Sequence, residues 1–266
     1  MKKRYAFLIA LVLLLIVGTG CEKMQKHQNS GSRIETKQNK KIKNFKEKNS
    51  SRKQNKKTIL NELKGSTKTS LKYYALGDSL SVGLFSNKQD SRFTTLFKND
   101  LEKGTGKKVI EINNSSVGKT VTNFGLPNVQ NLIDSNPDIV TIEFGTNDSA
   151  YGVDSKNLGD FINNLDTLVG RVKNETQAKI LLMTTWSPSD GQYKDNDSIY
   201  DQQIKKIGKK YQVQVVDLSK IWKDNPQVTE NDLGYSQVYN RSKDTFHPNQ
   251  QGHDKIAELL YQTIKE

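Results

Sequence analysis

The sequence predicts an α/β domain in which a parallel sheet lies between two layers of helices, and three observations predict it. Five short apolar runs, rich in β-branched or aromatic residues, recur between residues 72 and 216. Stretches with helical spacing of apolar residues separate these runs. Polar motifs follow three of the runs, where the strands of a parallel sheet end and functional groups collect.

The five expected strands are nearly continuous in apolar character, which is typical of strands buried on both faces of a sheet. They are Lys72–Leu76, Lys108–Ile112, Ile139–Phe144, Lys179–Thr184 and Gln212–Val216. The expected helices place apolar residues on one side at a period near 3.6. They are Thr94–Lys103, Leu158–Val172, Tyr200–Tyr211 and Gln250–Ile264. Right-handed crossovers between the strands follow as the default connection.

The positive charge of the chain is concentrated before the expected sheet. The 266 residues carry a net formal charge of +12, and residues 22–72 hold 16 Lys and Arg against 4 Asp and Glu. Residues 73–266 therefore have a net charge of −3, which argues against a nucleic-acid groove on the folded part. Residues 21–70 contain few large apolar side chains, and we interpret them as a disordered tether. Their basic charge would also favour contact with an anionic membrane surface.

The first 20 residues have the composition of a signal peptide. Lys2, Lys3 and Arg4 precede an apolar run of 12 residues, Ala6 to Val17, and a bilayer-spanning helix needs about 20. The single cysteine, Cys21, rules out an internal disulfide. This segment resembles a bacterial lipoprotein signal, although Gly18 stands where such signals usually carry Leu. The resemblance implies removal of residues 1–20, lipidation of Cys21 and an extracytoplasmic, membrane-anchored protein; an uncleaved anchor and ordinary secretion remain alternatives.

Two motifs far apart in the sequence provide a nucleophile and its base. Gly77-Asp78-Ser79-Leu80 follows the first strand, and Ser79 is the candidate nucleophile. Near the C-terminus, His247 precedes the last expected helix, and Asp244 lies three residues before it. A serine hydroxyl needs a base to remove its proton, and an acid beside that base orients it and stabilises its charged form. Taken singly, Ser79 and Asp244 also fit turns, and His247 also fits a half-buried polar residue.

Two further motifs provide donors for an oxyanion. Gly145-Thr146-Asn147-Asp148 follows the third strand, and Gly118 lies in the loop after the second. The Asn147 amide, the Gly118 backbone N–H and the Ser79 backbone N–H could stabilise the negative charge of a tetrahedral intermediate. We expect Asp148 to order the loop around Asn147.

In their order and spacing, these motifs resemble those of the SGNH hydrolase superfamily, the GDSL lipases and esterases. The letters correspond to Ser79, Gly118, Asn147 and His247, and the resemblance covers about Tyr73 to Ile264. It implies a hydrolase domain over residues 71–266 with a flavodoxin-like sheet of order 2-1-3-4-5. It also implies serine-dependent ester cleavage through an acyl-enzyme, without a metal or cofactor.

Other functions have weaker signals. Val117-Gly118-Lys119-Thr120 is similar to the end of a phosphate-binding loop, but Asn113 stands where that motif needs glycine. No cluster of Cys and His has zinc spacing. An acyltransferase and a non-catalytic wall- or lipid-binding module on the same fold remain alternatives. The substrate is an ester of an acyl lipid, an O-acetylated glycan or a small molecule, and the sequence does not distinguish them or indicate the oligomeric state.

Overall fold

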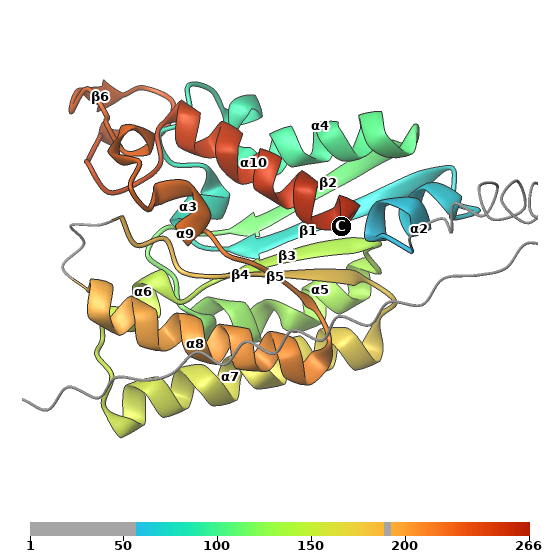
Figure 1. Ribbon diagram of the computed structural model, residues 1–266, viewed down its shortest axis with the longest axis horizontal. Helices are drawn as coiled ribbons and strands as arrows, with labels where there is room; N and C mark the ends of the chain where they lie inside the picture. Colours follow the sequence, from blue (N-terminus) through green and yellow to red (C-terminus); the bar gives the residue numbers. More distant parts are fainter. Residues whose placement is uncertain (1–56, 189–192) are drawn as a thin grey trace, which may run out of the picture. The chain divides into compact units, whose positions relative to one another are not determined.

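A five-stranded parallel sheet organises the part of the chain that the structure, a computed structural model, describes: residues 57–188 and 193–266 (Figure 1). The strands are paired in the order β2-β1-β3-β4-β5. They are β1 Ser70–Gly77, β2 Lys108–Ser115, β3 Ile139–Glu143, β4 Lys179–Met183 and β5 Gln214–Val216. The predicted α/β class, the five parallel strands and their flavodoxin-like order are confirmed. The predicted signal peptide and the tether up to residue 56, Cys21 included, lie outside the described residues.

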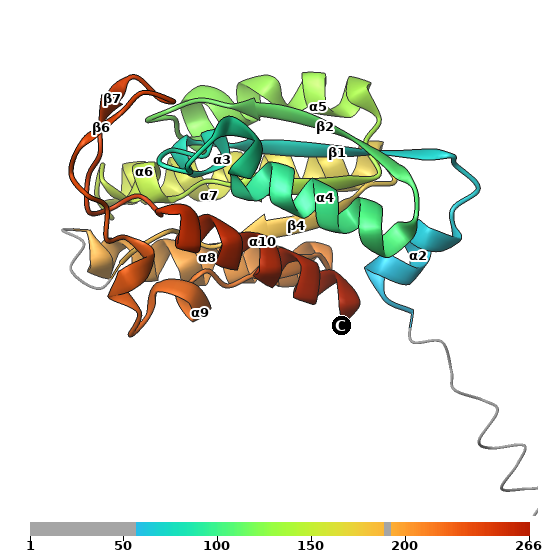
Figure 2. The same ribbon diagram turned by 90° about the horizontal axis from the view of Figure 1, so that it is seen from above.

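Helices cover both faces of the sheet, as the continuous apolar strands predict. One face packs against α2 Ile59–Gly65, α4 Phe93–Thr105 and α10 Gln250–Lys265. The other packs against α5 Val129–Ser135, α7 Ser155–Glu175 and α8 Lys194–Tyr211. Figure 2 shows α4 and α10 side by side on their face. Along β1 the side chains alternate between the layers, with Tyr73 in the first core and Tyr74 in the second.

Several strand ends differ from the prediction by one to three residues, and two of these differences have identifiable reasons. β2 continues three residues beyond Ile112, and its polar end pairs with β1 as far as Ser115 and Gly77. The Asn114 amide there donates to the hydroxyl of Tyr74 at 2.9 Å. β5 begins at Gln214 because Gln212, with φ +52°, ends α8 in the left-handed conformation.

The prediction of a disordered tether up to residue 70 is wrong for its last part. Thr58 caps α2 by accepting from the Asn61 N–H, and Leu63 is buried in the core formed with α4 and α10. Lys179 of β4 forms an ion pair with Glu62 of the same helix. Seven residues are too few to show helical periodicity, so the basic composition dominated the prediction.

The four predicted helices are present as α4, α7, α8 and α10, and the structure adds short elements. α8 begins at Lys194, six residues before the predicted start, with Asp195 and Asp197 in its first turn, where acidic groups favour a helix. Short elements include α5, the π-helical turn η2 Val121–Gly125 and the antiparallel pair β6 Tyr235–Ser236 and β7 Arg241–Ser242. Within the described ranges, no helix has both the length and the apolar character needed to cross a membrane.

The buried imidazole of His253 ties α10 to Leu84, which follows the short helical turn after β1. Its Nε2–H donates to the carbonyl oxygen of Leu84 at 2.9 Å, and its ring stacks on Phe93 with 6.1 Å between centroids. The side chain has no solvent exposure, and burial lowers its pKa to about 4. The folded protein therefore keeps His253 neutral at pH values where an unfolded chain protonates it.

This burial predicts a specific loss of stability in acid. Between about pH 6.5 and 4, the unfolded chain binds a proton that folded His253 refuses, so the free energy of unfolding falls as the pH falls. The drop in pKa corresponds to about 3 kcal/mol. Urea unfolding at pH 7 and pH 4 should show a smaller pH-dependent loss for His253→Gln than for the wild-type protein. An equal loss in the two proteins would contradict the prediction.

Candidate active site

Ser79 stands at the carboxyl edge of the sheet, where β1 turns into the one-turn helix α3 Ser79–Val82. Asp78 caps this helix, its carboxylate accepting from the Leu80 N–H at 3.0 Å. Ser79 is therefore the first residue of a helix, and its N–H has no partner within that helix. Ser79 is buried, with 5% of the residue exposed.

His247 joins Ser79 and Asp244 in one hydrogen-bonded relay. Its Nε2 lies 2.9 Å from Ser79 Oγ, and its Nδ1 lies 2.8 Å from Asp244 Oδ2. Because the ionised Asp244 carboxylate can only accept, Nδ1 carries the hydrogen and Nε2 can take the serine proton. Burial alone would raise the pKa of Asp244, but its bonds with His247 and the backbone N–H of Phe246 hold it below its ordinary value. The structure therefore brings Ser79, His247 and Asp244 together.

The loop that carries His247 is held by groups that sequence reasoning did not assign to the site. The Trp186 indole N–H donates to the Phe246 carbonyl at 2.7 Å. The Asn231 amide donates to the carbonyls of Asp244 and His247 at 2.8 and 3.2 Å. Trp186 is fully buried. The sequence offers no local signal for these contacts, because they join residues from separate segments.

Asn147 lies in the one-turn helix α6 Thr146–Ser149, directly after β3. Its Nδ2 donates to Asp78 Oδ2 at 2.7 Å and to the Lys119 carbonyl at 3.1 Å. The first bond links Asn147 to the residue preceding Ser79. The second brings the loop of Gly118, the residue before Lys119, to the same amide. Gly118 is exposed with φ +71°, a conformation that favours glycine.

Asp148 orders the Asn147 loop, as expected. Its carboxylate accepts from the backbone N–H groups of Gly145 at 3.2 Å and Val121 at 3.1 Å, and thereby joins α6 to η2. Burial raises its pKa to about 7. Gly145 has φ +123°, which explains a glycine at the start of this motif.

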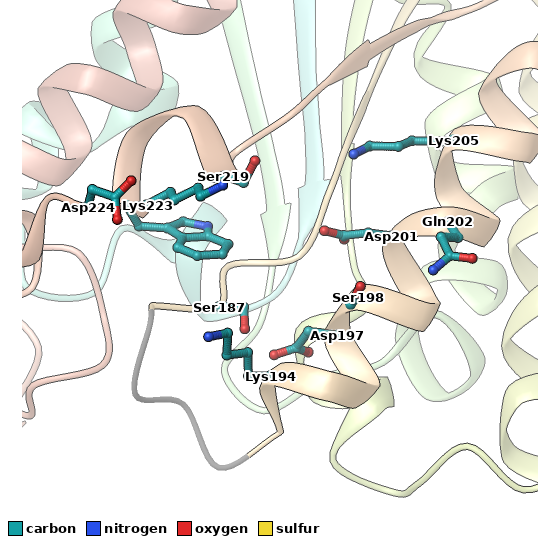
Figure 3. A pocket seen from close by; sticks show the side chains of 11 residues that line it. Ser187, Lys194, Asp197, Ser198, Asp201, Gln202, Lys205, Ser219, Lys223 and Asp224 are labelled. Carbon is teal, nitrogen blue, oxygen red and sulfur yellow. The ribbon is translucent and has the colours of Figure 1, made fainter. Parts of the chain in front are cut away.

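Two cavities lie near α6 in the described part of the chain, and neither is lined by Ser79, Asn147 or His247. The larger, of about 400 Å³, lies between α8 and α9 Ser219–Trp222 (Figure 3). The Asp197 carboxylate on its wall accepts from the hydroxyl of Ser149 in α6. The smaller, of about 200 Å³, includes Asp148 and the largely exposed ring of Tyr151. The larger cavity is lined by Ser187, Lys194, Asp197, Ser198, Asp201, Gln202, Lys205, Ser219, Trp222, Lys223 and Asp224.

The sheet, the serine at its carboxyl edge and the His–Asp pair beside it are the features of an SGNH-type serine ester hydrolase. Comparison with known proteins agrees: the profile of the GDSL-like Lipase/Acylhydrolase family matches residues 75–255. The chain belongs to this family, and it is an enzyme that hydrolyses esters. Within the described residues, no group of three or more His, Cys, Asp or Glu could hold a metal ion.

Individual relatives are also esterases. An arylesterase of Vibrio mimicus is 30% identical over 155 residues, which cover 58% of this chain and 74% of the relative. The esterase EstA from Pseudoalteromonas sp. has a TM-score of 0.56 at 22% identity, covering 73% of this chain and 96% of that one. The acetyl xylan esterase AlAXEase has a TM-score of 0.57 at 20% identity, covering 73% and 100%. At these identities the two structures show a shared fold.

Proposed function

We propose that the enzyme cleaves carboxylic esters through an acyl-enzyme on Ser79. The observation that carries the proposal is the relay from Ser79 Oγ to His247 Nε2 at 2.9 Å and from His247 Nδ1 to Asp244 at 2.8 Å. Ser79 Oγ attacks the ester carbonyl carbon while its proton passes to His247 Nε2. When the tetrahedral intermediate collapses, the protonated imidazole gives this proton to the departing alcohol. Water, deprotonated by the same imidazole, then attacks the acyl carbon. The acid departs, and the imidazolium returns the proton to Ser79 Oγ.

The oxyanion is proposed to form between α3, α6 and the Gly118 loop. The Ser79 N–H, the Gly118 N–H and the Asn147 amide are the donors. Both hydrogens of the Asn147 amide are already engaged, with Asp78 and the Lys119 carbonyl. The Lys119 bond is the longer, so the substrate oxygen would take its place while Asp78 keeps the amide oriented. One well-placed donor of this kind contributes about 3–4 kcal/mol to transition-state stabilisation.

Removal of the nucleophile tests this mechanism. Ser79→Ala should lower kcat for p-nitrophenyl acetate by more than about 10⁴-fold, since the rest of the relay acts only through Ser79. A fluorophosphonate probe should label the wild-type protein and leave this variant unlabelled. Ser135→Ala, at the end of α5, is the matched control and should keep wild-type turnover. An unlabelled but folded wild-type protein would point to a binding module, and an active Ser79→Ala variant would remove the mechanism.

We also propose an O-acylated glycan as the substrate class in preference to an acyl lipid. Both cavities beside α6 are lined mainly by charged and polar side chains, which suit sugar hydroxyls better than an acyl chain. Tyr151, 65% exposed, offers a ring face beside the smaller cavity. The acetyl xylan esterase with the same fold acts on an ester of this class.

A comparison of substrates tests this choice. The enzyme should release acetate from acetylated xylo-oligosaccharides with a higher kcat/KM than it shows for p-nitrophenyl palmitate. Tyr151→Ala should lower kcat/KM for the oligosaccharide about tenfold, the effect of losing one well-placed contact. The same variant should hydrolyse p-nitrophenyl acetate at the wild-type rate, which controls for the catalytic relay. Preference for palmitoyl esters would favour a lipid substrate instead.

The location of the enzyme is proposed from the sequence of its first 72 residues. We propose an extracytoplasmic lipoprotein, anchored through Cys21 and attracted to the membrane surface by the basic segment that follows. The support is the short apolar run after Lys2, Lys3 and Arg4, and the position of the single cysteine directly behind it. The basic segment adds to a lipid anchor, because a single acyl chain alone holds a protein only weakly.

Metabolic labelling tests the anchor. A bacterial host grown with an alkyne-tagged fatty acid should transfer the tag to the wild-type protein and none to Cys21→Ser, because no other cysteine is present. The wild-type protein should sediment with membranes. A wild-type protein without the tag, or an equally tagged Cys21→Ser variant, would refute lipidation at this residue.

A further inference from the structure

Glu143, the last residue of β3, lies beneath the turn that carries Ser79. It is opposite Gly77 in the register of β1 and β3, and its side chain has no solvent exposure. Its Oε2 accepts from the Asp78 N–H at 3.2 Å and from the Ser81 hydroxyl at 3.1 Å. One buried oxygen thus holds the residue before Ser79 and the residue two positions after it.

The Glu143 side chain lies so close to Gly77 that it explains why this position, just before the turn of Ser79, is a glycine. A Cβ atom at Gly77 would lie 2.2 Å from Ser81 Oγ and 2.8 Å from Glu143 Oε2. Neither distance is compatible with a side chain unless the Glu143–Ser81 contact is broken. Gly77 has an ordinary strand conformation, so the requirement is for space and not for a positive φ.

Burial favours the neutral form of Glu143. Burial, and then the negative charge of Asp78, raises the pKa of Glu143 well above its ordinary value. Asp78 is the better anion of the pair, because its carboxylate accepts from the Leu80 N–H and the Asn147 amide, and a charged acceptor strengthens both bonds. The hydrogen bond between the Glu143 and Asp78 carboxyl groups needs one proton, and the higher pKa of Glu143 places that proton on Glu143. Glu143 therefore donates to the Asp78 carboxylate while its Oε2 accepts from the Asp78 N–H and the Ser81 hydroxyl.

We propose that Glu143 is a positioning residue, a neutral acceptor that fixes Asp78 and Ser81 and so aims Ser79 Oγ at His247. The proposal rests on the assignment of Ser79 as the nucleophile. Asp78 extends the effect to Asn147. Its backbone N–H is bound by Glu143, and its carboxylate accepts from the Asn147 amide at 2.7 Å. Loss of the Glu143 acceptor would therefore misplace the nucleophile and an oxyanion donor together, without touching the groups that contact a substrate's remote parts.

Two substitutions of similar size separate positioning from bulk packing. Glu143→Gln keeps a neutral acceptor and should retain kcat for p-nitrophenyl acetate within about threefold. Glu143→Leu fills much of the space but accepts no bond, and should lower kcat about 100-fold, the scale of a small misplacement of reacting groups. KM should stay near the wild-type value in both variants, and the rate of fluorophosphonate labelling should fall in parallel with kcat.

Thr141→Val controls for stability alone. Thr141 lies two residues earlier on the same face of β3, and its hydroxyl bonds with that of Tyr73 at 2.8 Å. This variant should unfold at a lower urea concentration with unchanged kcat. If Glu143→Leu fails to fold, Ser81→Ala replaces it. It removes one of the two bonds to Glu143 and should lower kcat several-fold with KM unchanged.

The outcomes distinguish this inference from the proposed mechanism. Wild-type kcat and labelling rate in Glu143→Leu, or in Ser81→Ala where the Leu variant does not fold, would overturn the positioning role. If Glu143→Gln loses as much kcat as Glu143→Leu, Glu143 does not act as a neutral acceptor. Activity in Ser79→Ala would instead overturn the nucleophile on which the inference rests.

Discussion

The active site depends on one hydrogen bond between groups 168 residues apart, from Ser79 Oγ to His247 Nε2 at 2.9 Å. Ser79 is fixed by the end of β1, whereas His247 belongs to a loop whose position follows from the packing of α10 on α4. Asn249 caps α10 by accepting from the Gly252 N–H, so the helix begins at Gln250, three residues after His247. The apolar core between the sheet and these two helices therefore helps to set the distance between Ser79 Oγ and His247 Nε2.

Three carboxyl groups of the sequence motifs or next to them are buried beneath this bond. They belong to Asp78, Glu143 and Asp148. Burial raises the pKa of each, which means that the fold opposes their charge. Backbone N–H groups of Leu80, Gly145 and Val121 offset part of this opposition. Such a cluster costs stability and fixes the turns around it, a combination that is common where a fold has to hold reactive groups in place.

The sequence predicted the layers of the fold well because a parallel sheet covered on both faces needs continuous apolar strands, and β1, β3 and β4 have them. The prediction from the sequence was wrong where polar residues form part of a strand, and where a few apolar residues lie in a basic segment. The polar end of β2 is held by pairing with β1 and by Asn114, and α2 is held by Leu63 in a core made of distant residues. Asn231 and Trp186 support the His247 loop through contacts that no local pattern encodes.

By itself, the sequence determined the chemical groups of the site and their order: a serine, a glycine, an asparagine and a His–Asp pair, three of them placed where strands end. Motif identity and apolar periodicity are local properties, so they can be recognised in the sequence without knowledge of the fold. Only the tertiary structure decided that Asp78 would hold the Asn147 amide and that Glu143 would lie under Gly77. Strand register and helix packing bring those residues together, and both depend on the sum of many contacts that no single segment of the chain contains.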